Sequence, residues 1–314
     1  MNVAIANDNS APSSARGGAW PAIHGWASDG VDEIAFVHEP YLARPDLARP
    51  DARPRGAVLV MPAMGVEARY YEPLAVALAA RGFAVARAEL RGHGASPVRA
   101  GRGRDFGYRE LAERSLPALI EALRERWPNV PRIVLGHSLG GQVASLYASL
   151  PGADLDALIL IASGSVDHRG WPASQQTRVL FGTQLYAMIA RVLGYFPGDK
   201  LGFAGREPRS QILDWAHNAR TGRWQLRGSA RDWEAALGEV DLPVLAISVD
   251  GDDYAPHGAV DRQVAKLRAA QVERIRLTRE SAPPELLHHF RWARSPESMV
   301  ATIDEWLTRA LDRR

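Results

Sequence analysis

A serine stands between two glycines in the segment Gly136-His137-Ser138-Leu139-Gly140. This segment follows an apolar run, residues 132–135, that predicts a buried strand, and it precedes small residues that open a predicted helix over 138–150. Flanking glycines permit the crowded strand-to-helix turn that raises a serine hydroxyl above a sheet. The Gly-x-Ser-x-Gly pattern alone is common, but between a strand and a helix it predicts that Ser138 is a nucleophile for acyl transfer.

Two backbone amides near this turn could stabilise a negative charge on the substrate. The amide of Leu139 would lie at the N-terminus of the predicted helix, where a free N–H and the helix dipole favour an oxyanion. A second donor is expected from Pro62-Ala63-Met64-Gly65, which follows the apolar run 57–61. Because proline has no N–H, we predict Met64 as this donor, with Ala63 as the alternative.

A serine hydroxyl needs a base, and the base needs an acid that orients it. After serine turns of this type, the acid follows a late strand. Asp250-Gly251-Asp252-Asp253-Tyr254-Ala255-Pro256 follows the predicted strand 244–249 and supplies the acid candidates. Three carboxylates also suggest a calcium loop, but Tyr254 stands at a ligand position and the required glycine and distal glutamate are missing. We therefore expect no metal ion.

The base is expected in a loop before the last helix. His288 and His289 precede the predicted helix 296–311 and are the candidates among nine histidines. His137 is expected to pack beside the serine turn, and His93 lies in the glycine-rich segment Arg91-Gly92-His93-Gly94-Ala95-Ser96. We expect structural roles for both.

The composition excludes several classes of function. Without cysteine, the chain can form no disulfide, no thiolate metal site and no cysteine nucleophile. The 38 basic residues nearly balance 36 acidic ones and are spread along the chain, so a nucleic-acid partner is not indicated. The N-terminus lacks the features of a secretory signal, and no apolar run reaches the roughly 18–20 residues of a membrane span. A cytoplasmic protein is the default expectation.

Strands and helices alternate along most of the chain. Short apolar runs at 57–61, 83–88, 132–135, 157–161, 244–249 and 274–277 predict strands, and helices are predicted over 70–81, 108–126, 138–150, 257–270 and 296–311. This order predicts an α/β fold with a mostly parallel sheet flanked by helices. A further strand is predicted at 33–38, and the prolines of 43–54 predict an exposed loop.

The aromatic-rich stretch 165–240 interrupts the alternation and predicts an inserted helical lid. We therefore expect a flexible leader over 1–25, a core in two parts over 26–164 and 241–314, and the lid between them.

Together these motifs resemble the α/β-hydrolase superfamily, in particular bacterial proteins of the serine aminopeptidase-like (S33) group. The resemblance runs from about residue 27 to the C-terminus. It rests on motifs that stand in the family's order: Pro62-Ala63-Met64-Gly65-Val66 with Arg69-Tyr70-Tyr71, then Arg91 to Ser96, then Gly136 to Gly141, then the loops that hold the acid and base candidates. Glu89 departs from the family pattern, in which an aspartate commonly precedes Leu-Arg-Gly.

The resemblance also selects among the candidates. In such relatives the acid precedes a proline by four positions, which implies Asp252, through Pro256. The base follows a glycine in a Gly-His-Phe pattern; here His288 replaces the glycine, so His289 before Phe290 is the better match. The family includes esterases, lipases, thioesterases, peptidases and acyltransferases, so the resemblance does not supply a substrate.

We therefore expect a serine hydrolase that cleaves a carboxylic ester, or a related acyl bond, of a small and apolar substrate through an acyl-enzyme on Ser138. No cofactor is expected. One alternative is an acyltransferase with the same triad, which excludes water from the acyl-enzyme; another is a ligand-binding protein that lacks catalysis. The apolar side chains of 165–240 fit either an acyl-chain site or packing within the lid.

Overall fold

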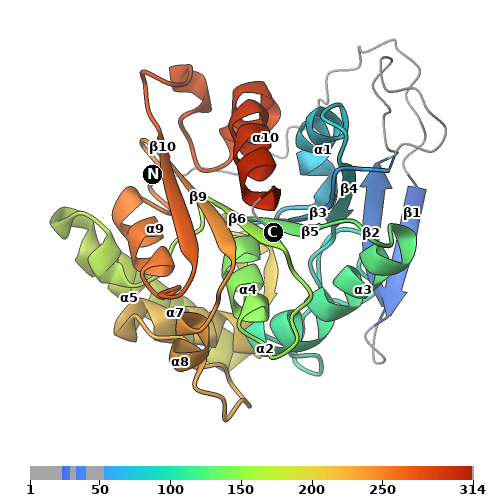
Figure 1. Ribbon diagram of the computed structural model, residues 1–314. Helices are drawn as coiled ribbons and strands as arrows, with labels where there is room; N and C mark the ends of the chain where they lie inside the picture. Colours follow the sequence, from blue (N-terminus) through green and yellow to red (C-terminus); the bar gives the residue numbers. More distant parts are fainter. Residues whose placement is uncertain (1–22, 29–32, 40–52, 313–314) are drawn as a thin grey trace.

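A mixed sheet forms the centre of the protein in the computed structural model, which describes residues 23–28, 33–39 and 53–312 (Figure 1). Its eight strands are β1 (Ile23–Ser28), β2 (Glu33–Glu39), β3 (Ala57–Met61), β4 (Ala84–Ala88), β5 (Arg132–His137), β6 (Ala157–Ile161), β9 (Pro243–Val249) and β10 (Gln271–Leu277). The strand order is β1-β2-β4-β3-β5-β6-β9-β10. β1 and β2 are antiparallel to each other, β2 is antiparallel to β4, and the six strands from β4 to β10 are parallel. The predicted α/β class is confirmed.

Helices cover both faces of the sheet, which explains why its central strands are apolar on both sides. One face carries α1 (Glu72–Ala79) and α10 (Glu297–Leu311); the other carries α3 (Leu116–Arg126), α4 (Leu139–Ala148), α8 (Trp233–Gly238) and α9 (His257–Val264). Successive residues of a strand point to opposite faces and so enter different cores. In β3, Val58 and Val60 pack in the core beneath α1 and α10, and Leu59 packs in the core on the other face.

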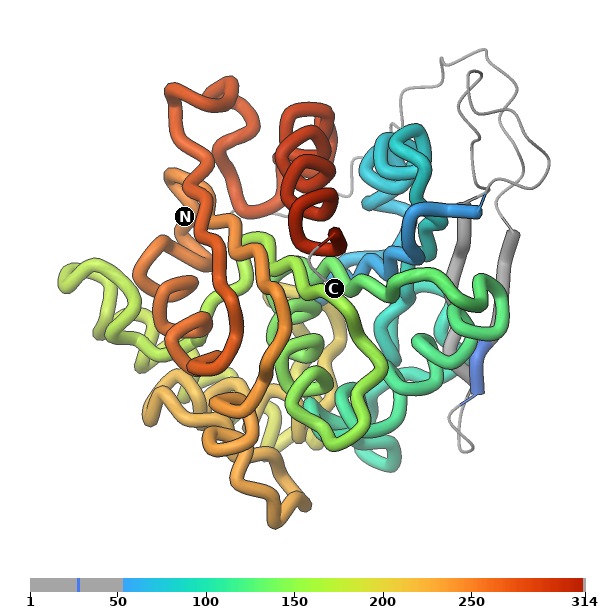
Figure 2. Tube along the Cα trace, viewed as in Figure 1, coloured from blue at the N-terminus to red at the C-terminus, as the bar shows by residue number. Residues whose placement is uncertain are grey.

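The chain leaves the sheet after β6 and returns to it at β9 (Figure 2). We call residues 162–242 the β6–β9 segment. It contains α5 (Ala173–Leu193), β7 (Tyr195–Pro197), α6 (Gly198–Leu201), β8 (Arg206–Pro208), α7 (Arg209–Thr221) and α8. The aromatic rings of Tyr186, Phe196, Phe203 and Trp215 pack against one another, with the Tyr186 centroid 4.7 Å from that of Phe196 and 5.2 Å from that of Phe203. These rings give the segment an apolar core of its own.

The chain enters the sheet earlier than its sequence suggested. Residues 23–25 were expected in the leader, but they begin β1, which pairs with β2 from Ile23 opposite His38 to Ser28 opposite Glu33. Pairing with β2 forms this strand although its own sequence shows no clear alternation. The rest of the leader, to residue 22, and residues 43–52 of the predicted loop lie outside the described residues.

Two predicted helices differ from expectation, one by an internal irregularity and one by its length. The helix predicted over 108–126 is divided by a π-helical turn at Leu111–Ser115. Pro117 follows that turn and has no N–H to donate to a carbonyl in the preceding turn, which favours the irregular geometry. The helix predicted over 257–270 ends at Val264, and the turn that follows brings Leu267 into the core.

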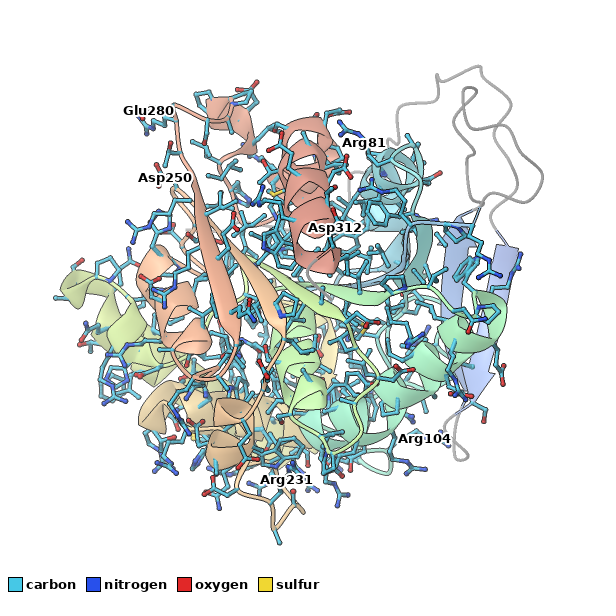
Figure 3. All side chains as sticks on the ribbon, in the orientation of Figure 1. Arg81, Arg104, Arg231, Asp250, Glu280 and Asp312 are labelled. Carbon is cyan, nitrogen blue, oxygen red and sulfur yellow. The ribbon has the colours of Figure 1, made fainter. Side chains whose placement is uncertain are left out.

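Side chains fill the space between the sheet and its helices on both faces (Figure 3).

The longest helix of the described residues, α5, has 21 residues, and Gln175, Arg178 and Gln184 interrupt its apolar positions. None of the helices in 53–312 is long and apolar enough to cross a membrane.

Candidate active site

The carboxyl ends of β3 and β5 lie side by side, because the strands pair in register with Met61 opposite Gly136. The chain continues from β3 to β4 on one side of this pair and from β5 to β6 on the other. In open parallel sheets, such a reversal of strand order leaves a crevice at the carboxyl ends of the strands. Ser138 and the segment 62–65 follow these two strand ends directly.

Ser138 occupies a strained turn between β5 and α4. Its φ of 52° and ψ of −117° lie outside the regions that non-glycine residues favour. The Ser138 amide donates to the Ile161 carbonyl at 3.0 Å, and the Ser138 carbonyl accepts from Ser163 Oγ at 2.7 Å. The end of β6 therefore holds the turn in this conformation, with the serine half-buried.

Gly140 brings the start of α4 against the end of β3. A Cβ at this position would lie 2.2 Å from the Met61 carbonyl oxygen and 2.7 Å from that of Pro62. Only glycine permits so close an approach of two backbones. As a result, the Leu139 amide at the helix N-terminus, which has no acceptor within the helix, lies beside the loop that contains Met64.

Asp252 and His289 form a buried pair. His289 Nδ1 lies 2.8 Å from Asp252 Oδ2, and both side chains are almost inaccessible. Asp252 Oδ1 accepts from the amides of Tyr254 and Ala255 at 2.8 and 2.9 Å. Because an ionised carboxylate only accepts hydrogen bonds, this contact selects the tautomer of a neutral His289 ring that carries its proton on Nδ1 and a lone pair on Nε2.

The His289 ring reaches the serine turn. Its centroid lies 4.9 Å from that of His137, the residue before Ser138. The His289 carbonyl accepts from Trp292 Nε1 at 2.9 Å, and Tyr70 Oη donates to the Phe290 carbonyl at 2.9 Å. These bonds fix the loop that carries the histidine.

The other candidates for the acid and the base have different partners. Asp250 Oδ1 lies 2.7 Å from His257 Nε2, while Asp253 is exposed and its carbonyl accepts from Trp171. His288 Nδ1 accepts from the Phe290 amide. The three carboxylates of the loop therefore diverge, and the structure pairs Asp252 with His289.

Three buried groups connect the loop after β3 to the serine turn. The Ala63 amide donates to Tyr71 Oη at 3.0 Å, and that hydroxyl lies 2.6 Å from His137 Nδ1. The hydroxyl has one proton, so it accepts from Ala63 and donates to His137. Burial holds the pKa of His137 well below its usual value, so the ring is neutral. As expected, His137 packs beside the turn.

Sequence reasoning missed three side chains at this site. Ser163 binds the Ser138 carbonyl, Tyr71 bridges Ala63 and His137, and the Tyr254 ring lies 5.2 Å from that of His289. Tyr71 belongs to a motif that carried the family resemblance, and Tyr254 to the acid loop. No signal in the sequence marks Ser163 beyond its place after a strand.

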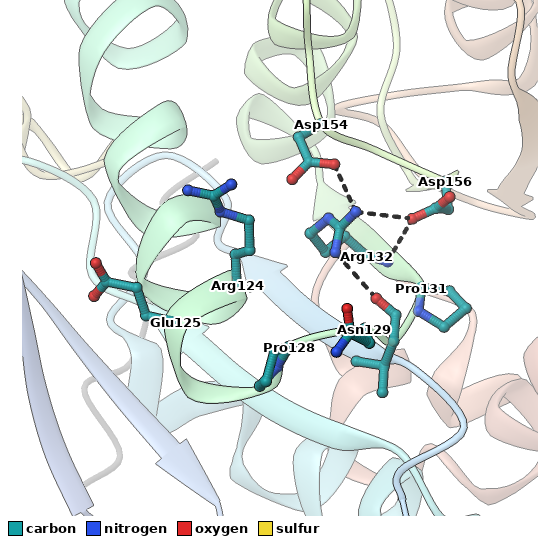
Figure 4. A pocket seen from close by; sticks show the side chains of 9 residues that line it. Arg124, Glu125, Pro128, Asn129, Pro131, Arg132, Asp154 and Asp156 are labelled. Carbon is teal, nitrogen blue, oxygen red and sulfur yellow. Dashed lines mark hydrogen bonds and ion pairs between the residues drawn. The ribbon is translucent and has the colours of Figure 1, made fainter.

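A shallow pocket lies at the opposite, amino end of β5 (Figure 4). Both of its aspartates are partners of Arg132, whose side chain lies 2.7 Å from Asp154 and 3.9 Å from Asp156 and whose amide donates to Asp156. Ser138 is at the other end of the strand, so this pocket is not part of the candidate site.

The strand order, the strained serine turn after β5 and the buried Asp–His pair define an α/β hydrolase. The family model described as "Serine aminopeptidase, S33" matches residues 52–277. The chain belongs to this family.

Two curated relatives are similar in sequence. A monoacylglycerol lipase of Mycolicibacterium smegmatis is 32% identical over 127 residues, which cover 40% of this chain and 44% of that protein. A pimeloyl-[acyl-carrier protein] methyl ester esterase of Nitrosomonas europaea is 30% identical over 198 residues, which cover 57% of this chain and 71% of that protein. The chain thus matches less than half the length of the first relative.

Solved structures share the fold. A soluble variant of monoglyceride lipase from Saccharomyces cerevisiae aligns with a TM-score of 0.65 at 13% identity, over 96% of this chain and 99% of that one. A thermostable carboxyl esterase from Bacillus coagulans aligns with a TM-score of 0.60 at 18% identity, over 91% of this chain and 98% of that one. At these identities the comparison supports the fold alone.

Proposed function

We propose that this protein is an ester hydrolase that forms an acyl-enzyme on Ser138. The observation that carries the proposal is the buried pair of Asp252 and His289, joined at 2.8 Å, whose imidazole lies against the residue before Ser138. The curated relatives named as a monoacylglycerol lipase and a methyl ester esterase support an ester as the substrate class.

In the proposed mechanism, His289 Nε2 accepts the proton of Ser138 Oγ as that oxygen attacks the ester carbonyl. Asp252 holds the imidazole in the required tautomer and stabilises the imidazolium. The imidazolium then gives its proton to the departing alcohol, which leaves an acyl group on Ser138. A water molecule, activated by the same histidine, hydrolyses this acyl-enzyme and restores the serine.

We assign the oxyanion hole to the amides of Leu139 and Met64. Leu139 lies at the N-terminus of α4, where the helix dipole favours negative charge. The Ala63 amide already donates to Tyr71 Oη, and Pro62 has no N–H, which favours Met64 in the loop after β3. The close contact of Gly140 with the carbonyls of Met61 and Pro62 supports this assignment, because it holds the start of α4 against the loop after β3.

We further propose that residues 165–240 form a lid between the two parts of the core, the first of which ends at residue 164 and the second of which begins at 241. Phe203 of this unit stacks on Tyr254, with ring centroids 6.3 Å apart, and Tyr254 in turn lies on His289. An apolar wall beside the base favours a small, apolar acyl substrate.

The test is hydrolysis of p-nitrophenyl esters of increasing chain length by the wild type and Ser138→Ala. We expect saturable hydrolysis with a preference for one range of acyl length, and loss of turnover in the variant. Equal hydrolysis by both proteins would contradict the proposal. A repeat with an added alcohol acceptor separates hydrolysis from acyl transfer, since ester formation that outpaces hydrolysis would assign an acyltransferase instead.

A further inference from the structure

A buried carboxylate joins the β6–β9 segment to the loop after β4, and the proposed mechanism does not use it. Glu207 of β8 is fully buried. Its carboxylate accepts from the Gly205 amide at 3.0 Å and from Gln211 Nε2 at 2.7 Å, and it lies 3.2 Å from His93 Nε2. A buried charge costs several kcal/mol unless it is paired and hydrogen-bonded. These contacts therefore fix the positions of the groups around Glu207.

The turn 203–205 lies between this carboxylate cluster and the loop after β3. A Cβ on Gly65 would lie 2.6 Å from both Ala204 C and Gly205 N, so the backbone of the turn touches Gly65 directly. On the other side, a Cβ on Gly205 would lie 2.7 Å from His93 Cε1. Ala204 has a φ of 58°, which is unfavourable for alanine and indicates that its surroundings impose the conformation.

Met64, the neighbour of Gly65, also depends on the β6–β9 segment. Its side chain packs against the cluster that Ala190, Phe196 and Ile212 form within that segment. The turn 203–205 therefore contacts the backbone next to Met64, while the apolar cluster holds its side chain. A shift of the turn would change the direction in which the Met64 amide points.

We propose that Glu207 and His93 are positioning residues that hold the turn 203–205 against Gly65 and so orient the Met64 amide. This inference rests on the proposed function, in which that amide binds the oxyanion. The pair acts through the turn, because the side chains of Glu207 and His93 contact Gly205, Gln211 and each other.

The charge of His93 gives this arrangement a pH dependence. The pKa of His93 lies above its usual value. Burial lowers it, and so does the charge of Arg99, but the negative charges of Glu207 and Glu89 raise it by more. Below that pKa the imidazolium pairs with Glu207. As the pH rises through it, the ion pair loses one charge, so the hold on the turn weakens on the alkaline side.

The experiment measures kcat and KM for p-nitrophenyl butyrate across the pH range, with Glu207→Gln and His93→Gln. Loss of a whole oxyanion donor costs about 10²–10³ in kcat. Glu207→Gln should displace the Met64 amide without removing it, so the loss in kcat should be smaller, about tenfold, with little change in KM. His93→Gln keeps a donor for Glu207, but that donor is neutral at every pH. Its kcat should therefore stay close to the lower, alkaline level of the wild type across the pH range and show no alkaline decline of its own.

Asp105→Asn is the matched control. Asp105 accepts from the Ser210 amide at 2.8 Å and from Arg209 at 3.0 Å, so it also ties the β6–β9 segment to the core, but away from the turn 203–205. Its substitution should leave kcat and the pH profile unchanged. A general loosening of the segment would instead lower kcat in this variant as well, and would overturn the inference.

The outcomes separate the two proposals. Wild-type hydrolysis that depends on Ser138, together with an unchanged kcat in folded Glu207→Gln or an unchanged alkaline limb in His93→Gln, overturns the positioning role alone. Absence of Ser138-dependent hydrolysis refutes the proposed function, and this inference with it. If Glu207→Gln fails to fold, the pH profile of His93→Gln decides the question.

Discussion

Replacing Gly140 by alanine should separate the two halves of the proposed oxyanion hole. The added Cβ would lie 2.2 Å from the Met61 carbonyl oxygen, so the backbones of α4 and the loop after β3 must move apart by about 1 Å to reach an ordinary contact of 3.4 Å. A misplacement of about 1 Å in a catalytic group can cost about 10²-fold in rate. We therefore expect kcat for p-nitrophenyl butyrate to fall about 10²-fold. Overpacking should also cost about 1–3 kcal/mol in the free energy of unfolding.

Gly182→Ala in α5 is the control, because a Cβ there meets nothing within 4 Å. Alanine in place of glycine within a helix should stabilise the protein by about 0.5–1 kcal/mol and leave kcat unchanged. Urea unfolding and steady-state kinetics on both variants measure the two effects separately. A folded Gly140→Ala protein with wild-type kcat would refute the assignment of the oxyanion hole to this junction.

Four further substitutions test other parts of the site and fold. Asp252→Asn should lower kcat by about 10⁴-fold, as expected when the acid no longer fixes the tautomer of the base, whereas Asp253→Asn should stay active; the reverse result would reassign the acid. Burial raises the pKa of Asp214 to about 8, so the folded state retains a proton that the unfolded chain loses above about pH 4. The unfolding free energy should therefore fall by up to about 1.4 kcal/mol per pH unit between these values, and urea titrations of Asp214→Asn should show a flatter profile; an equal slope would contradict this. Tyr71→Phe removes the partner of two buried groups and should lower the unfolding free energy by about 1–3 kcal/mol, and an unchanged value would show that this bridge adds no stability.

The parallel part of the sheet could be predicted because its strands are buried on both faces. The runs at Ala57–Met61 and Ala157–Ile161 are continuous apolar segments, and they form β3 and β6 with those bounds. β1 at the sheet edge could not be predicted in the same way. Its register comes from pairing with β2, and its residues Ile23–Ser28 do not form the continuous apolar run that burial on both faces would impose.

Some parts of the candidate site could likewise be predicted from the sequence, and others could not. The serine turn and the loops with Asp252 and His289 follow strands or precede helices that the sequence reveals. The contacts that fix them are between residues distant in the chain, such as Ser163 with the Ser138 carbonyl. The pair of His93 and Glu207 spans 114 residues, and neither residue indicates the other by its spacing.

The central claim is that Ser138 is an activated nucleophile. Treatment of the folded protein with a fluorophosphonate, followed by intact and peptide mass spectrometry, tests it most directly. We expect one adduct per chain, located on Ser138, and a marked loss of labelling in His289→Ala, which removes the base. Absence of an adduct on the folded wild type, or an adduct on another residue, would contradict it.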